Sequence, residues 1–267
     1  MDKLSRLENE SIFIIREAYY QFKKVAMLWS IGKDSTALMW LVRKAFYGKL
    51  PFPVLHIDTG YKFKEIYEFR DEYAKKWNLD LIVHKNQAAF DSGVSPKEGN
   101  KLKCCTELKT NALKEAITKH GFRALYLGIR RDEHGIRAKE RFFSPRDEDF
   151  EWNYKEQPPE LWDQYKTKAK DEEHLRIHPL LSWREIDIWD YIKRENIPIT
   201  SLYFAKDGKR YRSIGCETCC SPVDSNADSI DAIVEELRTS KVSERSGRAQ
   251  DKESAYMMQK LRSLGYM

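Results

Sequence analysis

The chain has 267 residues, which is enough for one large α/β domain or for one domain with an appendage. Its hydrophobic fraction of 41% and its aromatic fraction of 12% are typical of a packed globule and exclude a disordered chain. The net charge of +5 is small beside 47 basic and 42 acidic side chains. It is compatible with an anionic substrate such as a nucleotide and is too weak to argue for nucleic acid.

Two further features indicate a cytoplasmic protein with no membrane association. No apolar run approaches the roughly 20 residues that a membrane span needs, and residues 1–6 lack the apolar core of a signal peptide. The five cysteines fall into two tight groups, Cys104-Cys105 and Cys216-x-x-Cys219-Cys220. This grouping is unlike a secreted disulfide framework and favours metal ligands or redox groups.

The first half of the chain alternates between helical and extended patterns. Strands with helices at this spacing predict a doubly wound, mostly parallel sheet that is covered on both faces. The expected helices are 11–22, 35–47, 63–77 and 108–120, and the expected strands are 25–29, 53–58, 79–84 and 124–129.

The middle of the chain, residues 130–173, is charged, contains three prolines and shows little apolar periodicity, so we expect a long functional loop or lid. Regularity returns over 175–181, and the capping box at 182–185 predicts a helix that continues to about residue 192. A short helix is expected over 231–239, followed by a polar stretch, 241–254, that is mobile or ordered by substrate. We expect a nucleotide-binding α/β domain over 1–200 and a C-terminal segment over 201–267.

The segment 30–35, Ser-Ile-Gly-Lys-Asp-Ser, lies between a predicted strand and a predicted helix and has the features of a phosphate cradle. Gly32 allows close approach, Lys33 supplies charge, and Ser30, Ser35 and Thr36 supply hydroxyls at the helix start. Asp34 and Ser35 are expected to be essential for catalysis. The segment matches neither the P-loop nor Gly-x-Gly-x-x-Gly, and the alternative is an ordinary strand-to-helix turn.

Two other strand ends carry candidate residues, and the carboxyl ends of parallel strands meet at one edge of a sheet. Asp58 is a candidate for holding Mg²⁺ or an adenosine hydroxyl, or it caps an Asp-Thr-Gly turn. Five cations follow the strand at 124–129, which suits a polyanion, although such runs also occur on solvated surfaces. They are Arg130, Arg131, Arg137, Lys139 and Arg141. We expect Arg130, Arg131 and Lys139 to hold the attacking anion.

These residues resemble the PP-loop ATP pyrophosphatases, within the superfamily of PAPS reductase-like proteins and adenine nucleotide α-hydrolases. Ile31 replaces the usual second glycine, as in the small catalytic subunit of bacterial ATP sulfurylase (sulfate adenylyltransferase). The likeness continues through Arg130–Glu133, Arg137–Arg141, Ser144–Asp147, Pro159–Trp162, Asp187–Ile192, Arg210–Cys216 and Ser243–Arg248, and so covers nearly the whole chain. It implies a five-stranded doubly wound sheet, adenylyl transfer with release of pyrophosphate, and a GTPase large subunit as partner. It also implies substrate binding by Arg245 and Arg248.

Two departures from that small subunit are visible. Only residues 205–209 separate Leu202-Tyr203-Phe204 from Arg210-Tyr211-Arg212-Ser213, where the usual subunit has an insertion. The thiols resemble the four-cysteine iron–sulfur site of adenylylsulfate reductases and of the ATP pyrophosphatases of DNA phosphorothioation. We therefore expect a [4Fe–4S] cluster, while structural zinc or inert cysteines are the alternatives. The expected ligands are Cys104, Cys105, Cys216 and Cys219, with Cys220 left over.

The sequence therefore predicts an enzyme that uses ATP and Mg²⁺ and in which an oxyanion attacks the α-phosphorus in line. Sulfate is the first choice of acceptor. The alternative is a DNA phosphate oxygen, with a cysteine desulfurase as partner, and a third possibility is a non-catalytic nucleotide-sensing subunit. Sulfonucleotide reduction is disfavoured because no cysteine follows Cys220. A homodimer is compatible with the sequence.

Overall fold

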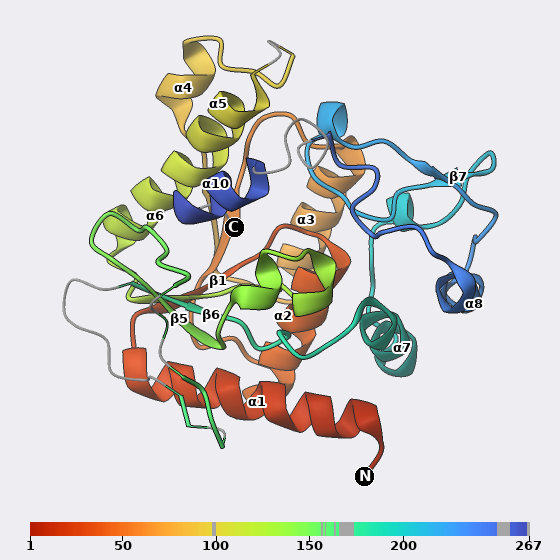
Figure 1. Cartoon of the computed structure of the whole chain (residues 1–267), viewed down its shortest axis with the longest axis horizontal. Coiled ribbons are helices and arrows are strands. Elements are labelled where there is room, and N and C mark those ends of the chain that lie inside the picture. The colour runs from red at the N-terminus through yellow and green to blue at the C-terminus, as the bar shows by residue number, and fades with distance from the viewer. Residues whose placement is uncertain are drawn as a thin grey trace.

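The structure is a computed structural model that describes all residues except 98–99, 156, 158, 163, 166–173, 250–256 and 266–267. A six-stranded sheet, in the order β3-β2-β1-β4-β6-β5, runs through its centre (Figure 1). The first five strands in that order run parallel, and β5 pairs antiparallel with β6. The predicted doubly wound sheet is confirmed, with one strand more than expected. The strands are β1 (Val25–Leu28), β2 (Val54–Ile57), β3 (Leu81–His84), β4 (Ala124–Tyr126), β5 (Phe143–Arg146) and β6 (His174–Ile177).

The central strand β1 marks the point where the strand order reverses. Met27 lies opposite Val54 of β2 on one side and opposite Tyr126 of β4 on the other. The chain moves outward from β1 through β2 to β3 and then crosses back to β4. In open α/β sheets the ligand crevice lies at this reversal, beyond the carboxyl ends of the strands. The segments that follow β1 and β4 are therefore placed to form a site.

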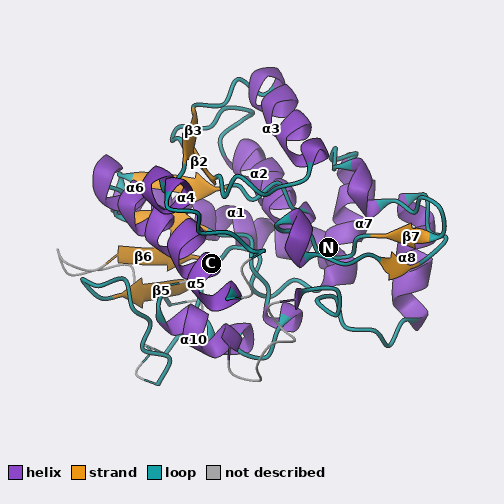
Figure 2. Cartoon of the chain, turned by 90° about the horizontal axis from the view of Figure 1, so that it is seen from above, coloured by secondary structure: helices purple, strands orange, loops and turns teal. Residues whose placement is uncertain are grey.

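Helices connect and cover the strands. Helix α1 packs against α2 and also contacts β4 and β6, while α7 packs against α2 and α8. Helices α4, α5 and α6 gather at one side of the molecule, whereas α7 and α8 lie at the other (Figures 1 and 2). The helices are α1 (Lys3–Phe22), α2 (Lys33–Ala45), α3 (Lys64–Lys76), α4 (Gln87–Asp91), α5 (Lys101–Cys105), α6 (Ala112–His120), α7 (Glu185–Glu195), α8 (Ile230–Thr239) and α10 (Met257–Ser263). None of the helices in these described parts is long and apolar enough to cross a membrane.

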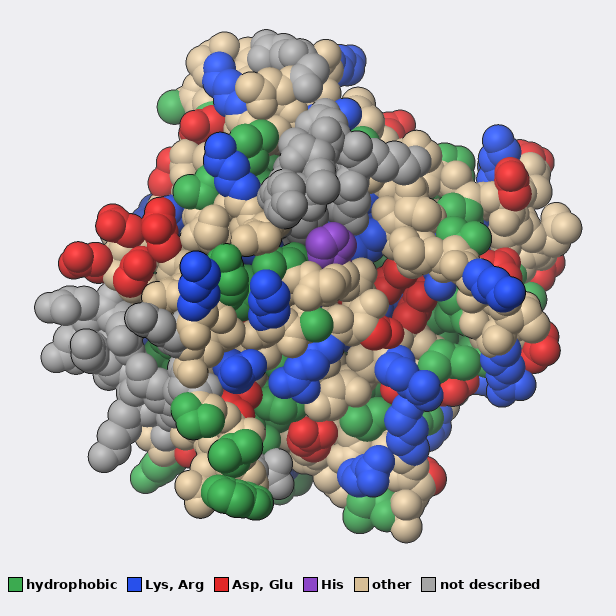
Figure 3. Space-filling model, in the orientation of Figure 1, with side chains coloured by type: hydrophobic (Ala, Val, Ile, Leu, Met, Phe, Trp, Pro, Cys, Tyr) green, Lys and Arg blue, Asp and Glu red, His purple; other side chains and the backbone are tan. Residues whose placement is uncertain are grey.

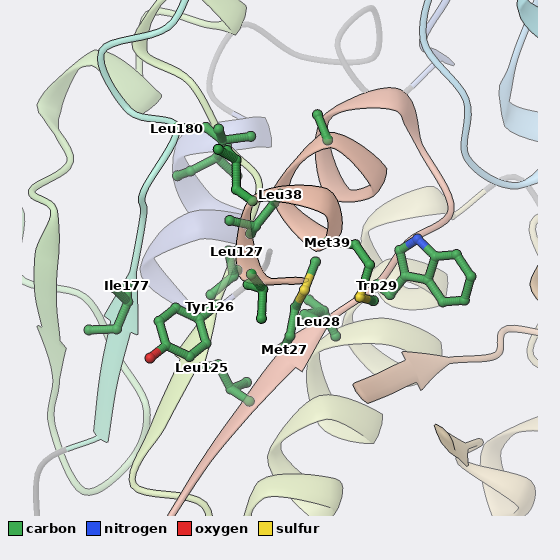
Figure 4. Packing of buried hydrophobic residues seen from close by; sticks show 14 of the residues in the cluster. Met27, Leu28, Trp29, Leu38, Met39, Leu125, Tyr126, Leu127, Ile177 and Leu180 are labelled. Carbon is green, nitrogen blue, oxygen red and sulfur yellow. The ribbon is translucent and has the colours of Figure 1, made fainter. Parts of the chain in front are cut away.

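The core lies between the central strands and α2. Every residue of β1, β2 and β4 is buried, because helices cover both faces of a parallel sheet. Figure 4 shows Met27 of β1 and Leu127, just after β4, beside Leu38 and Met39 of α2. This packing fixes the start of α2 relative to the ends of both strands. The loop between β1 and α2 is thus held by a rigid frame.

Three expectations about local structure need correction. The segment 130–173 is not entirely loop, because Phe143–Arg146 forms the antiparallel edge strand β5; residues 156, 158, 163 and 166–173 lie outside the described part. Helix α7 begins two residues later than the predicted capping box implies, with Arg184 in place of Ser182 as the N-cap residue. The Asp187 carboxylate accepts a hydrogen bond from the Arg184 amide at 2.9 Å. Helix α1 begins at Lys3, well before the predicted start, because the Asp2 side chain caps it by accepting from the Ser5 amide.

The C-terminal part forms a small hairpin and then returns to the main domain. Strands β7 (Lys209–Arg210) and β8 (Val223–Asp224) pair antiparallel. Before β7 the chain turns tightly at Asp207-Gly208, both with positive φ, so a short turn stands where the usual small subunit has its insertion. Helix α10 contacts α5 and lies beside it in Figure 1. Residues 250–254 of the predicted polar stretch lie outside the described part.

Candidate active site

The nucleotide loop joins β1 to α2 at the centre of the sheet edge. Ser30 and Ser35 face each other with their hydroxyl oxygens 3.1 Å apart, at the N-terminus of the 13-residue helix α2. A helix N-terminus carries unpaired amides and a partial positive charge, which favour a phosphate group. Ile31 has φ of 67°, a left-handed conformation that is strained for a β-branched residue. The glycine that PP-loop proteins usually have at this place would adopt it freely.

Gly128, just after β4, lies against this loop. A Cβ atom at Gly128 would come within 2.9 Å of the Ser35 amide nitrogen and 3.0 Å of the Asp34 carbonyl. Real Cβ atoms essentially never approach so closely. The end of β4 therefore packs directly against the backbone of the loop between β1 and α2, and only glycine fits there.

A pocket opens beside the loop at the strand reversal. It borders the ends of β1 and β4, the loop, the segment after β2, and two segments from the C-terminal part. Its cations indicate a site for an anionic ligand. The residues that line it are Leu28, Ser30, Gly32, Lys33, Asp34, Ser35, Lys62, Lys109, Leu127, Gly128, Ile129, Glu133, Arg137, Tyr203, Ser213, Ile214, Gly215, Arg245 and Arg248.

Eight of the residues chosen from the sequence line this pocket. They come from three separate segments, residues 30–35, residue 137 and residues 245–248, which the fold brings together. These residues are Ser30, Gly32, Lys33, Asp34, Ser35, Arg137, Arg245 and Arg248.

Two candidates near the nucleotide loop point elsewhere. The Thr36 hydroxyl accepts a hydrogen bond from the Trp29 indole at 3.2 Å and is buried in the core. Asp58 accepts from the Tyr67 hydroxyl and from the Gly60 amide, both at 2.8 Å. It therefore stabilises the turn after β2, which is the structural alternative considered from the sequence. Neither residue is among the pocket-lining residues.

Of the five cations that follow β4, some border the pocket and others do not. Arg130 is fully buried and forms ion pairs with Asp34, Asp132 and Glu244. Arg131 lies over the Phe142 ring at 5.1 Å, and Lys139 lies over the Tyr154 ring at 4.6 Å. Of this run only Arg137 lines the pocket, while Arg130, Arg131, Lys139 and Arg141 do not. Spacing alone places these cations at the sheet edge but does not say which way each side chain turns.

Lys33 has a different environment from the one expected. Its ammonium is buried and pairs with Glu244 and, at 3.1 Å, with Asp34. Burial alone would lower the pKa of Lys33, but the Glu244 carboxylate outweighs it and raises that pKa. The backbone amide of Lys33 donates to the Tyr203 hydroxyl at 2.8 Å. Both groups of Lys33 are thus engaged by residues from the C-terminal third of the chain.

Two lysines in the pocket wall were not found from the sequence. Lys62 follows the Asp-Thr-Gly turn after β2, a strand-end position that could have indicated it. Lys109 lies in a π-helical turn, η1 (Thr106–Asn111), between α5 and α6. Such turns recur at functional sites, but no local pattern in the sequence marks one. Glu133 also lines the pocket; burial would raise the pKa of its carboxyl, but Arg137 and Arg245 hold it well below the usual range.

The cysteines of both groups are buried, and Cys216 directly follows Gly215 of the pocket wall. Burial raises the pKa of Cys104 to about 12, and the nearby thiols of Cys105, Cys216 and Cys219 add to that effect. The Cys216 sulfur lies 3.3 Å from the Thr59 hydroxyl. Its burial is outweighed by Lys109 and Lys62, which lower its pKa to about 7. The fold therefore draws the two groups together, although the described residues contain no set of three ligands already arranged around a metal position.

One face of the molecule carries both charge signs. Figure 3 shows Lys and Arg side chains spread over the middle of one face, with acidic side chains between and beside them. No single extended basic patch is visible on that face. This distribution agrees with the small net charge of +5 and favours a small anion over a long polyanion.

Comparison with known proteins gives consistent matches along the chain. The phosphoadenosine phosphosulfate (PAPS) reductase domain family matches residues 24–222. "Sulfate adenylyltransferase subunit 2" of Psychromonas ingrahamii is 43% identical over 293 aligned positions, which cover 98% of this chain and 97% of that protein. The protein of the same name from Bacteroides fragilis is 44% identical and covers 100% of this chain and 98% of its own length.

Two solved structures share the fold at low sequence identity. PAPS reductase from Candida auris superimposes with a TM-score of 0.56 at 17% identity, covering 84% of this chain and 98% of its own. Candida glabrata FMN adenylyltransferase in complex with ATP gives a TM-score of 0.59 at 17% identity, and the alignment covers 99% of this chain and 83% of that one. These likenesses bear on the fold alone. The DNA phosphorothioation hypothesis gains no support from the comparisons.

Proposed function

The chain belongs to the family of sulfate adenylyltransferase subunit 2, and we propose on that premise that it transfers the adenylyl group of ATP to sulfate. One observation carries the proposal: relatives of that name match it at 43–44% identity from end to end. The pocket agrees with it, because a phosphate cradle and a set of cations face the same space.

In the proposed reaction a sulfate oxygen attacks the α-phosphorus of ATP. A new P–O bond forms to sulfate, the bond from the α-phosphorus to the bridging oxygen breaks, and pyrophosphate leaves with that electron pair. Ser30, Gly32 and Ser35 at the start of α2 bind the pyrophosphate, and Arg137, Arg245 and Arg248 hold the sulfate and balance developing charge. Asp34 and Glu133 are the pocket carboxylates that could hold the Mg²⁺ of the nucleotide, which would screen its phosphate charge.

Arg131, Lys139 and Arg141 are not among the residues to which we assign substrate binding in the pocket. Because these side chains do not border the pocket, we propose that they act only on the approach of the anion or on the partner. Arg130 and Lys33 shape the site through their carboxylate partners. The alternative acceptor, a DNA phosphate, becomes one arm of the test.

The proposal is tested by comparing Arg248 with Arg141, two arginines that were both candidates for anion binding from the sequence. Arg248→Ala should lower kcat/KM for sulfate by about a hundredfold or more, because it removes a charge that faces the anion in a closed site. Arg141→Ala, the matched control outside the pocket, should stay within a factor of about three, as a surface substitution does. Adenylyl sulfate formation is measured with a duplex oligonucleotide as an alternative acceptor. Turnover that responds to the oligonucleotide and not to sulfate would overturn the proposal.

The relatives' name, subunit 2, supports a larger partner subunit. We propose that this partner is a GTPase, since the mixed anhydride of sulfate and phosphate is uphill and needs coupling to a second hydrolysis. Sulfate-dependent pyrophosphate release by the chain should rise when the large subunit and GTP are added. No change with GTP would leave the chain as a self-sufficient enzyme and refute the coupling.

For the thiols we propose a [4Fe–4S] cluster on Cys104, Cys105, Cys216 and Cys219. Four buried thiols from two segments fit it in number and chemistry, and the neighbouring Lys62 and Lys109 complement the negative charge of a thiolate-ligated cluster. Such a cluster would staple the C-terminal part to the sheet domain.

Protein purified without oxygen should then be brown and carry about four iron and four sulfide per chain. Cys104→Ser or Cys219→Ser should bleach it, whereas Cys220→Ser should not. One tightly bound zinc per chain would replace the cluster with a structural zinc site. Fully active protein without metal would make the cysteines ordinary buried residues.

A further inference from the structure

One carboxylate joins the C-terminal part to the nucleotide loop. Glu244 is buried and pairs with both the Lys33 ammonium and the Arg130 guanidinium, which lie 211 and 114 residues away in sequence. Asp34 pairs with the same two cations. Two carboxylates therefore alternate with two cations in a ring of four charges at the base of the pocket, and Arg130 also pairs with Asp132 at 3.0 Å.

Each cation of this ring is paired with at least two carboxylates, which changes its role. The Glu244 carboxyl would have a raised pKa from burial alone, but Arg130 and Lys33 lower it, so it stays ionised. A buried charge that is fully paired contributes little free charge to a ligand, whereas losing one partner leaves the others uncompensated. Lys33 and Arg130 thus act as attachment points for Glu244.

The residues that follow Glu244 are two of the cations that line the pocket. Arg245 lies next in sequence and pairs with Glu133 at 3.2 Å. The Arg248 guanidinium lies flat against Gly215, where a Cβ atom would collide with it. The C-terminal end of segment 244–248 is fixed by backbone contacts. Cys220 and Arg248 form an isolated antiparallel β-bridge, and the Ser221 amide donates a hydrogen bond to the Gly247 carbonyl at 2.9 Å.

The segment 244–248 is therefore held at two ends. One end is fixed to the cysteine-containing loop by backbone hydrogen bonds, and the other is tied to the nucleotide loop by the ion pair of Glu244 with Lys33. Between the two lie the guanidinium groups that border the pocket. A shift at Glu244 would be transmitted directly to Arg245.

We propose that Glu244 is a positioning residue that couples the nucleotide loop to the sulfate-binding arginines, by tying Arg245 and Arg248 to the Lys33–Arg130 pair. The proposal rests on the proposed function for the identity of the anion. It makes the acceptor site depend on the loop that holds ATP, so that the two substrates are aligned by one ionic connection.

The test is Glu244→Gln in the full chain with its partner subunit. The amide keeps the shape of the side chain and removes the charge, so the KM for sulfate should rise about tenfold or more, because a buried partner is lost. The KM for ATP should rise by clearly less than the KM for sulfate, because Ser30, Gly32 and Ser35 are untouched and Asp34 still pairs with Lys33 and Arg130. Glu235→Gln, on the exposed face of α8, is the matched control and should change neither.

A second measurement does not depend on activity. Hydrogen exchange of the amides of residues 243–248 should accelerate in Glu244→Gln, while exchange in β1 and α2 stays as in the wild type. If Glu244→Gln does not fold, Glu244→Asp, which keeps the charge but shortens the reach, should show the same pattern more weakly.

Two results would overturn the proposal. One is an equal rise in both KM values, which would place Glu244 on the nucleotide side. The other is unchanged exchange of residues 243–248, which would show that the carboxylate does not hold the segment. A wild-type protein that makes no adenylyl sulfate would refute the proposed function instead, and the exchange measurement would still decide the role of Glu244.

Discussion

Gly128→Ala is the substitution whose effect follows most directly from the geometry. The added Cβ would lie 2.9 Å from the Ser35 nitrogen and 3.0 Å from the Asp34 carbonyl, where ordinary contacts begin near 3.4 Å. The neighbours are backbone atoms at the start of α2, and they cannot turn aside as a flexible side chain could. The nucleotide loop must therefore move by about 0.5 Å to restore ordinary van der Waals separation.

The size of the effect follows from that displacement. Overpacking of this kind costs about 1–3 kcal/mol of folding free energy. Misplacement of a reacting group by about 1 Å costs on the order of a hundredfold in rate, so a shift half as large predicts a loss of about tenfold. The loss should appear in kcat/KM for ATP, because the displaced amides belong to the phosphate cradle.

The assay is pyrophosphate release from ATP and sulfate, with urea unfolding measured in parallel. Gly135→Ala is the matched control, since a Cβ at Gly135 meets nothing within 4 Å. It should leave both turnover and stability as in the wild type. Wild-type activity in Gly128→Ala, or an equal loss in both variants, would falsify the view that β4 supports the loop.

Two further predictions concern stability. Ile31 has a φ of 67°, where glycine is relaxed and alanine is strained; Ile31→Gly should therefore be more stable than Ile31→Ala by about 1 kcal/mol, the reverse of the usual order, and equal or inverted urea midpoints would contradict the strain. His56 is buried with its Nδ1 2.9 Å from the Trp29 carbonyl oxygen, and burial lowers its pKa from 6.5 to about 3. The unfolded chain alone takes up this proton as the pH falls from 6.5 towards 3, so His56 makes stability fall by up to about 1.4 kcal/mol per pH unit in that window. His56→Gln should make the free energy of unfolding depend less steeply on pH between 6.5 and 5, by up to the equivalent of one proton. An unchanged pH dependence would show that His56 is protonated in the fold.

Local chemistry made much of the frame predictable. The apolar run at 25–29, the small residues that follow and the helix that begins near Lys33 place a phosphate cradle without any knowledge of distant residues. The alternation of strands and helices gives the parallel sheet, because each parallel connection needs a helical crossover. The antiparallel strand β5 escaped prediction because Pro145 and the surrounding charges conceal a short edge strand.

The composition of the candidate site depended on contacts that sequence spacing does not encode. In the run after β4, spacing grouped five cations, yet packing against Phe142 and Tyr154 turns Arg131 and Lys139 away from the pocket. Lys109 reaches the pocket wall from a π-helical turn. The extra residue in such a turn rotates the side chains that follow, and no local sequence pattern predicts it.

The sequence by itself determined which loop is the candidate for phosphate binding and at which edge of the sheet it lies. Only the tertiary structure decided which charges face that loop and which neutralise one another. The pairing of Glu244 with Lys33 and Arg130 is the clearest case. A loop conformation is set by neighbouring residues, but the partner of a buried charge is whatever long-range packing brings within a few ångströms of it, where desolvation makes that partner necessary.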